Sequence, residues 1–190
     1  PASVPWRPPL EEPPAPGAQL AFTTCPPGEE IHCDEFGRVK ALLNFDRKSP
    51  EDDRSSAWMR VGQLALGGAI VLPRKDFEVL VDFEQGDLDR PFVAGHLYNA
   101  EAKPPYALPA DRTRSSFQTA TTSGGPGSNE LRFEDAKGSE EVYLHAQRDL
   151  KILVENDKSE TVGADESLRV GRDRVTEIGG NQTLKVGKDD

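Results

Sequence analysis

The residues best suited to bind a metal lie near the N-terminus, where Cys25, His32 and Cys33 fall within the string CPPGEEIHC. Thiolates and imidazoles are ligands that zinc prefers, but a structural zinc site has four ligands, commonly from two closely spaced pairs. This string offers three. The spacing therefore favours two ordinary thiols or a local disulfide, and we expect no metal ion and no cofactor.

Two acidic clusters could supply the paired carboxylates of general acid–base catalysis: Glu51–Asp53, and Asp87 with Asp89. A catalytic carboxylate needs burial or a charged neighbour to shift its pKa, whereas loops rich in charge are usually solvated. His96 and His145 lie in apparent strands, and no serine or cysteine nucleophile has an associated motif. We therefore expect no catalytic residues and no enzymatic activity in this chain.

Short strands are the elements that must position these residues. From about Asp34 onward, apolar and polar residues alternate over short runs that turn residues interrupt, as in antiparallel barrels and sandwiches. Five strands in about seventy residues fit an OB-fold barrel, and a hairpin follows it. The predicted barrel strands are Gly37–Phe45, Ala57–Gln63, Ala69–Leu72, Glu78–Phe83 and Phe92–Tyr98, and the predicted hairpin strands are Leu131–Glu134 and Glu141–Ala146.

The composition excludes two classes of protein. The chain has 190 residues and a formal net charge of −10, from 33 acidic and 23 basic side chains. Affinity for nucleic acid comes mainly from Lys and Arg, so we expect no nucleic-acid partner. No apolar run approaches the roughly 18–20 residues of a membrane-spanning helix, which argues against an integral membrane protein.

Four segments follow one another along the chain. Seven of the first twenty residues are proline, so we expect residues 1–33 to be an extended linker. The barrel is expected at 34–105, a connecting loop at 106–130, and the hairpin with a repetitive shaft at 131–190. Because the sequence begins without Met, we also expect it to be a piece of a longer protein.

The tail repeats with a period of eight residues. Four glycines each follow a β-branched residue, and Asp or Asn stands two positions after each glycine. Positions eight apart drift by about 80° on an α-helix, whereas an even period returns a side chain to the same face of a strand. Each octad therefore predicts one short strand and a turn, in which glycine adopts a positive φ and the Asx side chain bonds the turn backbone. The repeat residues are Val162, Gly163, Val170, Gly171, Ile178, Gly179, Val186 and Gly187.

One octad supplies only one or two apolar side chains, for example Leu168 and Val170, and cannot form a core alone. Either one chain winds three octads into each coil, or three chains each give one octad to a layer. A single chain from Ala146 onward would complete fewer than two coils, below the roughly three repeats that stability needs. The sequence therefore predicts a homotrimer whose fold is all-β: an OB-fold barrel followed by an intertwined trimeric β-helix of octapeptide repeats.

Acidic or Asn side chains recur at one octad position from Asp149 to Asp189. Stacked carboxylates could coordinate cations between layers. Turn capping explains the same pattern without an ion, and we favour it.

Several strings in the barrel and the tail resemble VgrG, the family of valine–glycine repeat spike proteins of type VI secretion systems. The resemblance covers about residues 34–190. Two features depart from the usual pattern: Lys75-Asp76-Phe77 replaces a commoner glycine-containing turn, and the loop Leu64–Gly68 is short. The strings that carry the resemblance are Ala57–Val61, Leu72–Arg74, Glu78–Phe83, Gly86–Pro91, Gly95–Asn99, Pro104–Pro109, Asn129–Asp135 and the octads.

The resemblance implies a trimeric, needle-like shaft related to the central spike of contractile phage tails. It also implies partners: a tube of Hcp rings, a PAAR-repeat protein at the tip, effector toxins or their adaptors, and transient contact with a target membrane. The implied function is to puncture membranes and carry effectors, with assembly in the bacterial cytoplasm followed by secretion and injection into a target cell.

Two alternative functions stay open. A phage-type baseplate spike would share the chemistry of the shaft. An OB-fold binding module with a trimerising stalk would instead need a concave face with exposed aromatic side chains, for which Trp58, Phe77 and Tyr98 are the candidates.

Overall fold

The computed structural model describes residues 17–187. The chain divides after Asp149 into two units. Apart from one short 3-10 turn, η1 (Glu84–Gly86), every regular element of the described residues is a strand. No helix in that part of the chain is long and apolar enough to cross a bilayer. The predicted all-β class is confirmed.

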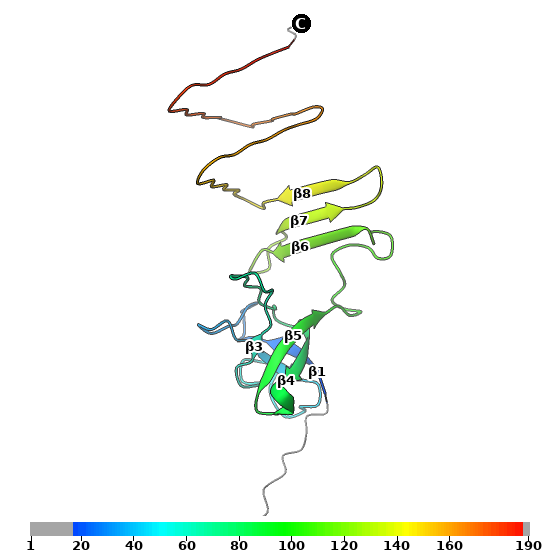
Figure 1. Ribbon diagram of the computed structural model, residues 1–190. Helices are drawn as coiled ribbons and strands as arrows, with labels where there is room; N and C mark the ends of the chain where they lie inside the picture. Colours follow the sequence, from blue (N-terminus) through cyan, green and yellow to red (C-terminus); the bar gives the residue numbers. More distant parts are fainter. Residues whose placement is uncertain (1–16, 188–190) are drawn as a thin grey trace, which may run out of the picture. The chain divides into compact units, whose positions relative to one another are not determined.

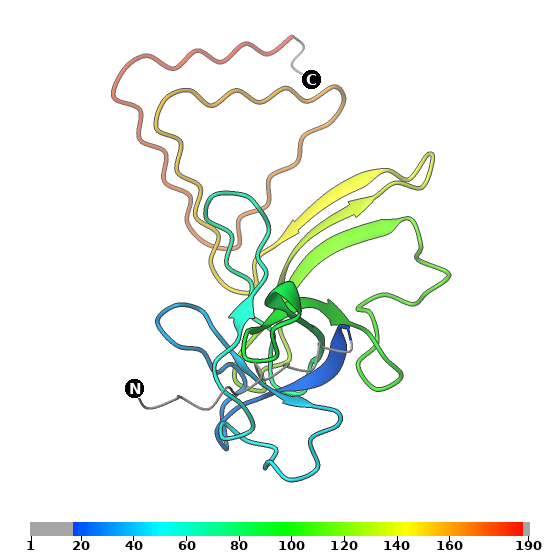
Figure 2. The ribbon, with the colours of Figure 1, turned by 60° about the horizontal axis from the view of Figure 1, so that its bottom comes forward.

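The first five strands form a small barrel (Figures 1 and 2). They lie in the order β2–β1–β4–β5–β3, with antiparallel neighbours except for the parallel pair β3–β5. Val39, just before β2, and Met59, just before β3, exchange backbone hydrogen bonds of 2.9 and 2.8 Å. This bridge joins the two outer strands of the sheet, so the sheet closes and leaves few unpaired edge groups. The strands are β1 (Gln19–Thr24), β2 (Lys40–Leu43), β3 (Arg60–Val61), β4 (Glu78–Phe83) and β5 (Pro91–Leu97).

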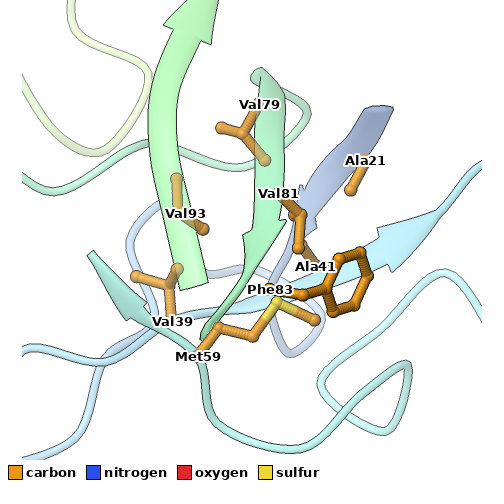
Figure 3. Packing of buried hydrophobic residues seen from close by; sticks show 8 residues of the cluster. All are labelled: Ala21, Val39, Ala41, Met59, Val79, Val81, Phe83 and Val93. Atoms are coloured by element: carbon orange, nitrogen blue, oxygen red, sulfur yellow. The ribbon is translucent and has the colours of Figure 1, made fainter. Parts of the chain in front are cut away.

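The interior of the barrel is filled mainly by alanine and valine side chains, together with Met59 and Phe83, as Figure 3 shows. Strand β4 illustrates why, because its sequence EVLVDF alternates and every second side chain is buried. Complete burial of one such valine stabilises the fold by roughly 1.5–3 kcal/mol relative to exposure. The buried cluster consists of Ala21, Val39, Ala41, Met59, Val79, Val81, Phe83 and Val93.

A second, three-stranded antiparallel sheet follows the barrel. It contains β6 (Arg114–Ala120), β7 (Ser128–Glu134) and β8 (Glu141–His145), paired in that order. The turn between β7 and β8 includes Gly138 with φ of +83°, a conformation that glycine adopts at no steric cost. The predicted hairpin is confirmed, with β7 beginning three residues before the predicted start.

Three predictions about individual segments are wrong. Gln19–Thr24, inside the expected linker 1–33, forms β1. The reason is its alternation, which places Ala21 in the core between β2 and β4. The proline-rich residues 1–16 lie outside the described residues. Ala69–Leu72 is not a strand, because the Gln63 side chain occupies both backbone groups of Val71. Arg114–Ala120, inside the expected loop 106–130, forms β6.

Candidate functional site

The tail bends at the predicted period. Bends occur at 155–156, 163–164, 171–172 and 179–180, with straighter stretches between them, and Figure 2 shows the resulting triangular winding. Within residues 150–187 there is no strand and no backbone-to-backbone hydrogen bond. Successive windings of one chain therefore do not pair with each other, although their backbone groups need partners in any stable β structure.

One face of the winding carries the branched residues of the repeat. Val162, Val170 and Ile178 are 46%, 45% and 45% exposed, and Val186 is 61% exposed. Val175 lies an odd number of residues before Ile178, so it falls on the other face of an extended segment. Val175 is 90% exposed. The four repeat residues form what we call the octad column, which the single chain only half covers.

Nothing within one chain explains why glycine occupies the four repeat positions. Gly163, Gly171, Gly179 and Gly187 do not adopt a positive φ, and a Cβ atom at any of them would meet nothing within 4 Å. The predicted Gly-Asx turn is therefore wrong for the described tail, because its side-chain hydrogen bonds join only Asn156 to Asp157 and Lys158 to Glu160. Asp189 lies outside the described residues. The glycines therefore leave open space beside the backbone at the bends.

The sheet β6–β8 has a bare apolar face. The strand register places Phe117, Leu131 and Leu144 opposite one another across the three strands, with Phe133 and Val142 in the next row. Side chains opposite one another in a sheet lie on the same face. Phe117, Val142 and Leu144 are all exposed. A contiguous apolar patch of this kind marks an interaction site.

The other face of the same sheet is polar, and most of its side chains are paired, although Arg132 Nε is buried without a hydrogen-bond partner among the described residues. The Arg132 guanidinium lies 4.3 Å from the Tyr143 ring centroid, and its Nη2 donates to Glu141 at 2.7 Å. Hydrogen bonds with Tyr106 and then with Glu141 raise the pKa of Arg132 above its usual value. Arg114 also stacks on Tyr106. Tyr106 of the same chain thus contacts Glu130 and Arg132 on the polar face, where Glu130 is buried. The apolar face has no comparable cover from the described part of the chain, since Phe117, Val142 and Leu144 stay exposed, which indicates that it meets a partner.

Two barrel loops hold the turn between β6 and β7. Arg74 pairs with Glu30 at 3.2 Å and donates a hydrogen bond to the carbonyl oxygen of Ala120, the last residue of β6. Glu30 also accepts a hydrogen bond from the backbone N–H of Gly124. We call this set the Glu30–Arg74 clasp. It links the barrel to the second sheet through more than the covalent chain.

The candidate metal ligands Cys25, His32 and Cys33 do not form a metal site among the described residues. Cys25 is buried and Cys33 is exposed, and both are free thiols. Burial raises the pKa of Cys25, so its thiolate is disfavoured. His32 Nδ1 lies 3.3 Å from Glu29 and its ring packs against Trp58. Among residues 17–187 no group of three or more His, Cys, Asp or Glu side chains could hold a metal ion.

The acidic clusters stabilise their own loops. Asp52 pairs with Arg54 at 2.5 Å, and this hydrogen bond lowers the pKa of Asp52. Asp87 pairs with Arg90 at 3.3 Å and accepts a hydrogen bond from the backbone N–H of Asp89. A general acid at neutral pH needs a raised pKa, so the shift at Asp52 runs in the opposite direction.

The candidate aromatic residues fall into two places. His96 stacks on Phe77 with ring centroids 4.5 Å apart and meets the edge of Tyr98 at 4.9 Å. Partial desolvation lowers the pKa of His96, although the residue stays exposed. Trp58 instead lies beside His32, with the Lys40 ammonium 4.9 Å from its ring centroid. His145, the other candidate histidine, stacks on Tyr143.

The interaction residues that sequence reasoning missed are the apolar sheet face and the clasp. The alternation in β6, β7 and β8 carries a signal for the face, since Phe117, Leu131 and Leu144 each alternate with polar neighbours. The clasp carries no such signal, because Glu30 and Arg74 are far apart in the sequence and are matched only by the fold.

Two family models match the chain. Residues 32–98 match the type VI secretion system/phage-baseplate injector OB domain. Residues 115–190 match the bacteriophage T4 gp5 C-terminal trimerisation domain. The second match contains β6 from its second residue onward, β7, β8 and the whole octad tail. The predicted fold class, an OB-fold barrel followed by a trimeric β-helix, is confirmed.

Relatives of known name are similar over most of the chain. The type VI secretion system spike protein VgrG4b of Pseudomonas aeruginosa is 49% identical over 170 residues, which are 85% of this chain and 21% of that protein. VgrG3 of Vibrio cholerae, also a type VI secretion system spike protein, is 44% identical over 174 residues, 90% of this chain and 17% of that protein. The chain therefore spans about a fifth of the length of these curated relatives.

A closed OB barrel followed by a trimerisation segment defines the class of injector spikes shared by phage baseplates and type VI secretion systems. Within that class, the relatives all carry the name of the secretion spike. The chain belongs to the VgrG family of type VI secretion system spike proteins, as its sequence resemblance predicted.

Proposed function

We propose that this chain forms the barrel and shaft of a homotrimeric secretion spike, which transmits thrust into a target envelope, carries effectors and catalyses no reaction itself. The observation that carries the proposal is the octad tail. It bends every eight residues and presents one half-covered column of branched side chains, yet between residues 150 and 187 its backbone forms no backbone-to-backbone hydrogen bond within its own chain.

Strand spacing explains why three chains fit this winding. Hydrogen-bonded strands lie about 4.8 Å apart, so a β-helix made from one chain would rise by about that distance per turn. If two other chains lie between successive turns of the first, each chain rises by about 14 Å per turn and pairs with its neighbours rather than with itself. The unpaired backbone of residues 150–187 agrees with the second arrangement.

The same arrangement gives the apolar surface a partner. In a trimer the octad column of Val162, Val170, Ile178 and Val186 turns toward the common axis, and the bare face of β6–β8 is covered by another copy of the chain. Burial of this surface stabilises the assembly by about 25 cal/mol per Å². Glycines at the bends leave room for the neighbouring chains. With every backbone group paired and a dry axis, the shaft resists bending and unfolding.

The wider partners belong to this proposal and come from the resemblance. We expect a tube of Hcp rings behind the spike, a PAAR-repeat protein at its tip, effector toxins or their adaptors as cargo, and transient contact with a target membrane. We expect assembly in the cytoplasm and secretion with the tube. The Glu30–Arg74 clasp supports a load-bearing role, because force on the barrel reaches the second sheet through several contacts.

The test uses the intact parent protein in its own host. We compare Ile178→Asp, which places three like charges at the axis, with Val175→Asp on the exposed face. The first change should abolish release of the tube protein into the medium and killing of competitor cells, because burial of an unpaired charge is strongly unfavourable. The second should leave both intact. Normal secretion by Ile178→Asp would contradict the proposal and would favour a binding module with a dispensable stalk.

A further inference from the structure

A loop of the barrel between β3 and β4 is apolar, uncharged and exposed. The stretch from Gly62 to Leu72, GQLALGGAIVL, contains no charged side chain. Within it Leu64, Leu66, Ile70 and Val71 are 54%, 76%, 73% and 63% exposed. We call residues 63–72 the apolar loop. Isolated apolar side chains on a surface are ordinary, but four in one loop mark an interaction site.

The apolar loop is held in shape by its own hydrogen bonds. The side-chain amide of Gln63 donates to the Val71 carbonyl oxygen at 3.1 Å and accepts from the Val71 N–H at 2.7 Å. The N–H of Gly62 donates to the carbonyl oxygen of Val93 in β5 at 2.8 Å. Because these bonds close the base of the loop, a partner would not have to supply the free energy of ordering it.

The loop lies next to the trimerising part of the same chain. After Leu72 the chain passes through Pro73 to Arg74, and Arg74 donates to the Ala120 carbonyl oxygen while pairing with Glu30. Ala120 falls inside the match to the trimerisation domain, which begins at residue 115. The base of the loop is thus fixed to the first strand of the segment that brings three chains together.

Electrostatics also favours a second copy of this chain as the partner of the apolar loop. Each chain carries a net charge of −10, so three copies of the chain repel one another on the whole. The apolar loop is one surface of the barrel at which two copies can approach without juxtaposing carboxylates. Chains joined through their shafts also meet at an effective concentration in the millimolar range, at which a modest apolar contact is largely formed.

We propose that in the trimer the apolar loop of each chain packs against a neighbouring copy, so that the contact between chains extends from the shaft onto the barrel. The proposal rests on the homotrimer proposed above. It identifies Leu66 and Ile70, the most exposed side chains of the loop, as contact residues between copies.

The first experiment places a photo-crosslinking amino acid at position 66 of the full chain, and in a matched variant at Phe45, which is 61% exposed on another barrel loop. Irradiation should give products of two and three chains from position 66 and essentially none from position 45. If the particle is a trimer and position 66 gives no inter-chain product, the loop contacts something else and this inference is overturned. If no trimer exists, the proposed function fails first.

The second experiment measures exchange of labelled subunits between trimers. Leu66→Asp should accelerate exchange at least about tenfold relative to the unchanged chain, and Phe45→Asp should change it by less than about twofold. Neither side chain is buried in one chain, so circular dichroism should show the barrel unchanged in both. Equal exchange rates for the two variants would overturn the inference.

Discussion

The size of the stability loss caused by Ile178→Ala distinguishes a trimeric shaft from a shaft made by a single chain. Ile178 is 45% exposed in one chain, and the proposed trimer buries the remainder. At a fully buried site the change from isoleucine to alanine costs about 2–5 kcal/mol. Three symmetry-related copies lose the side chain together, so the trimer should lose about 6–15 kcal/mol, equivalent to at least about a 10⁴-fold weaker association constant.

The assay combines denaturant unfolding with light-scattering mass at several protein concentrations. Val175→Ala is the matched control, because Val175 is 90% exposed and lies off the octad column; it should change stability by no more than about 0.5 kcal/mol. Ile178→Ala should dissociate at concentrations where Val175→Ala remains trimeric. Indistinguishable behaviour of the two variants would refute the placement of the octad column at a shared axis.

Three further predictions concern the barrel. Asp76 has φ of +63°, a conformation that glycine adopts without steric cost. In denaturant unfolding, Asp76→Gly should therefore stabilise the barrel by about 0.5–1 kcal/mol, whereas Asp76→Ala should not. A loss of stability with glycine would show that the Asp side chain matters more than the backbone conformation. Cys33 should react with an alkylating agent in the native protein at neutral pH and Cys25 only after unfolding, since Cys25 is buried and its pKa is raised; equal rates would contradict this account. Partial desolvation lowers the pKa of folded His96 below its unfolded value of about 6.5, so the unfolded chain binds the proton more readily and barrel stability should fall as the pH drops below about 6.5, by a small amount because the residue is exposed. His96→Phe should flatten this part of the pH profile, and an unchanged slope would assign it to other groups.

The sequence predicted those elements in which a period matches a physical constraint. Strand β4 was placed at its observed bounds because EVLVDF alternates and one face fills the barrel. The eight-residue spacing of bends in the tail follows from the Val-Gly repeat. Neither prediction needed knowledge of distant contacts.

Other elements were missed because their structure depends on partners. Gln19–Thr24 follows a proline-rich run, and only pairing with β2 and β4 identifies it as a central strand. Ala69–Leu72 has strong β propensity but no neighbouring strand, since Gln63 bonds Val71 instead. The predicted turn caps of the octads failed for a similar reason, because the tail makes few contacts within its own chain.

The mass of the assembled particle in solution, followed by light scattering through a dilution series, tests the central claim most directly. Three associated chains of 20.8 kDa predict a mass of about 62 kDa that persists on dilution. A compact, stable particle with the mass of one chain would contradict the claim that residues 150–187 find their backbone and apolar partners in other copies.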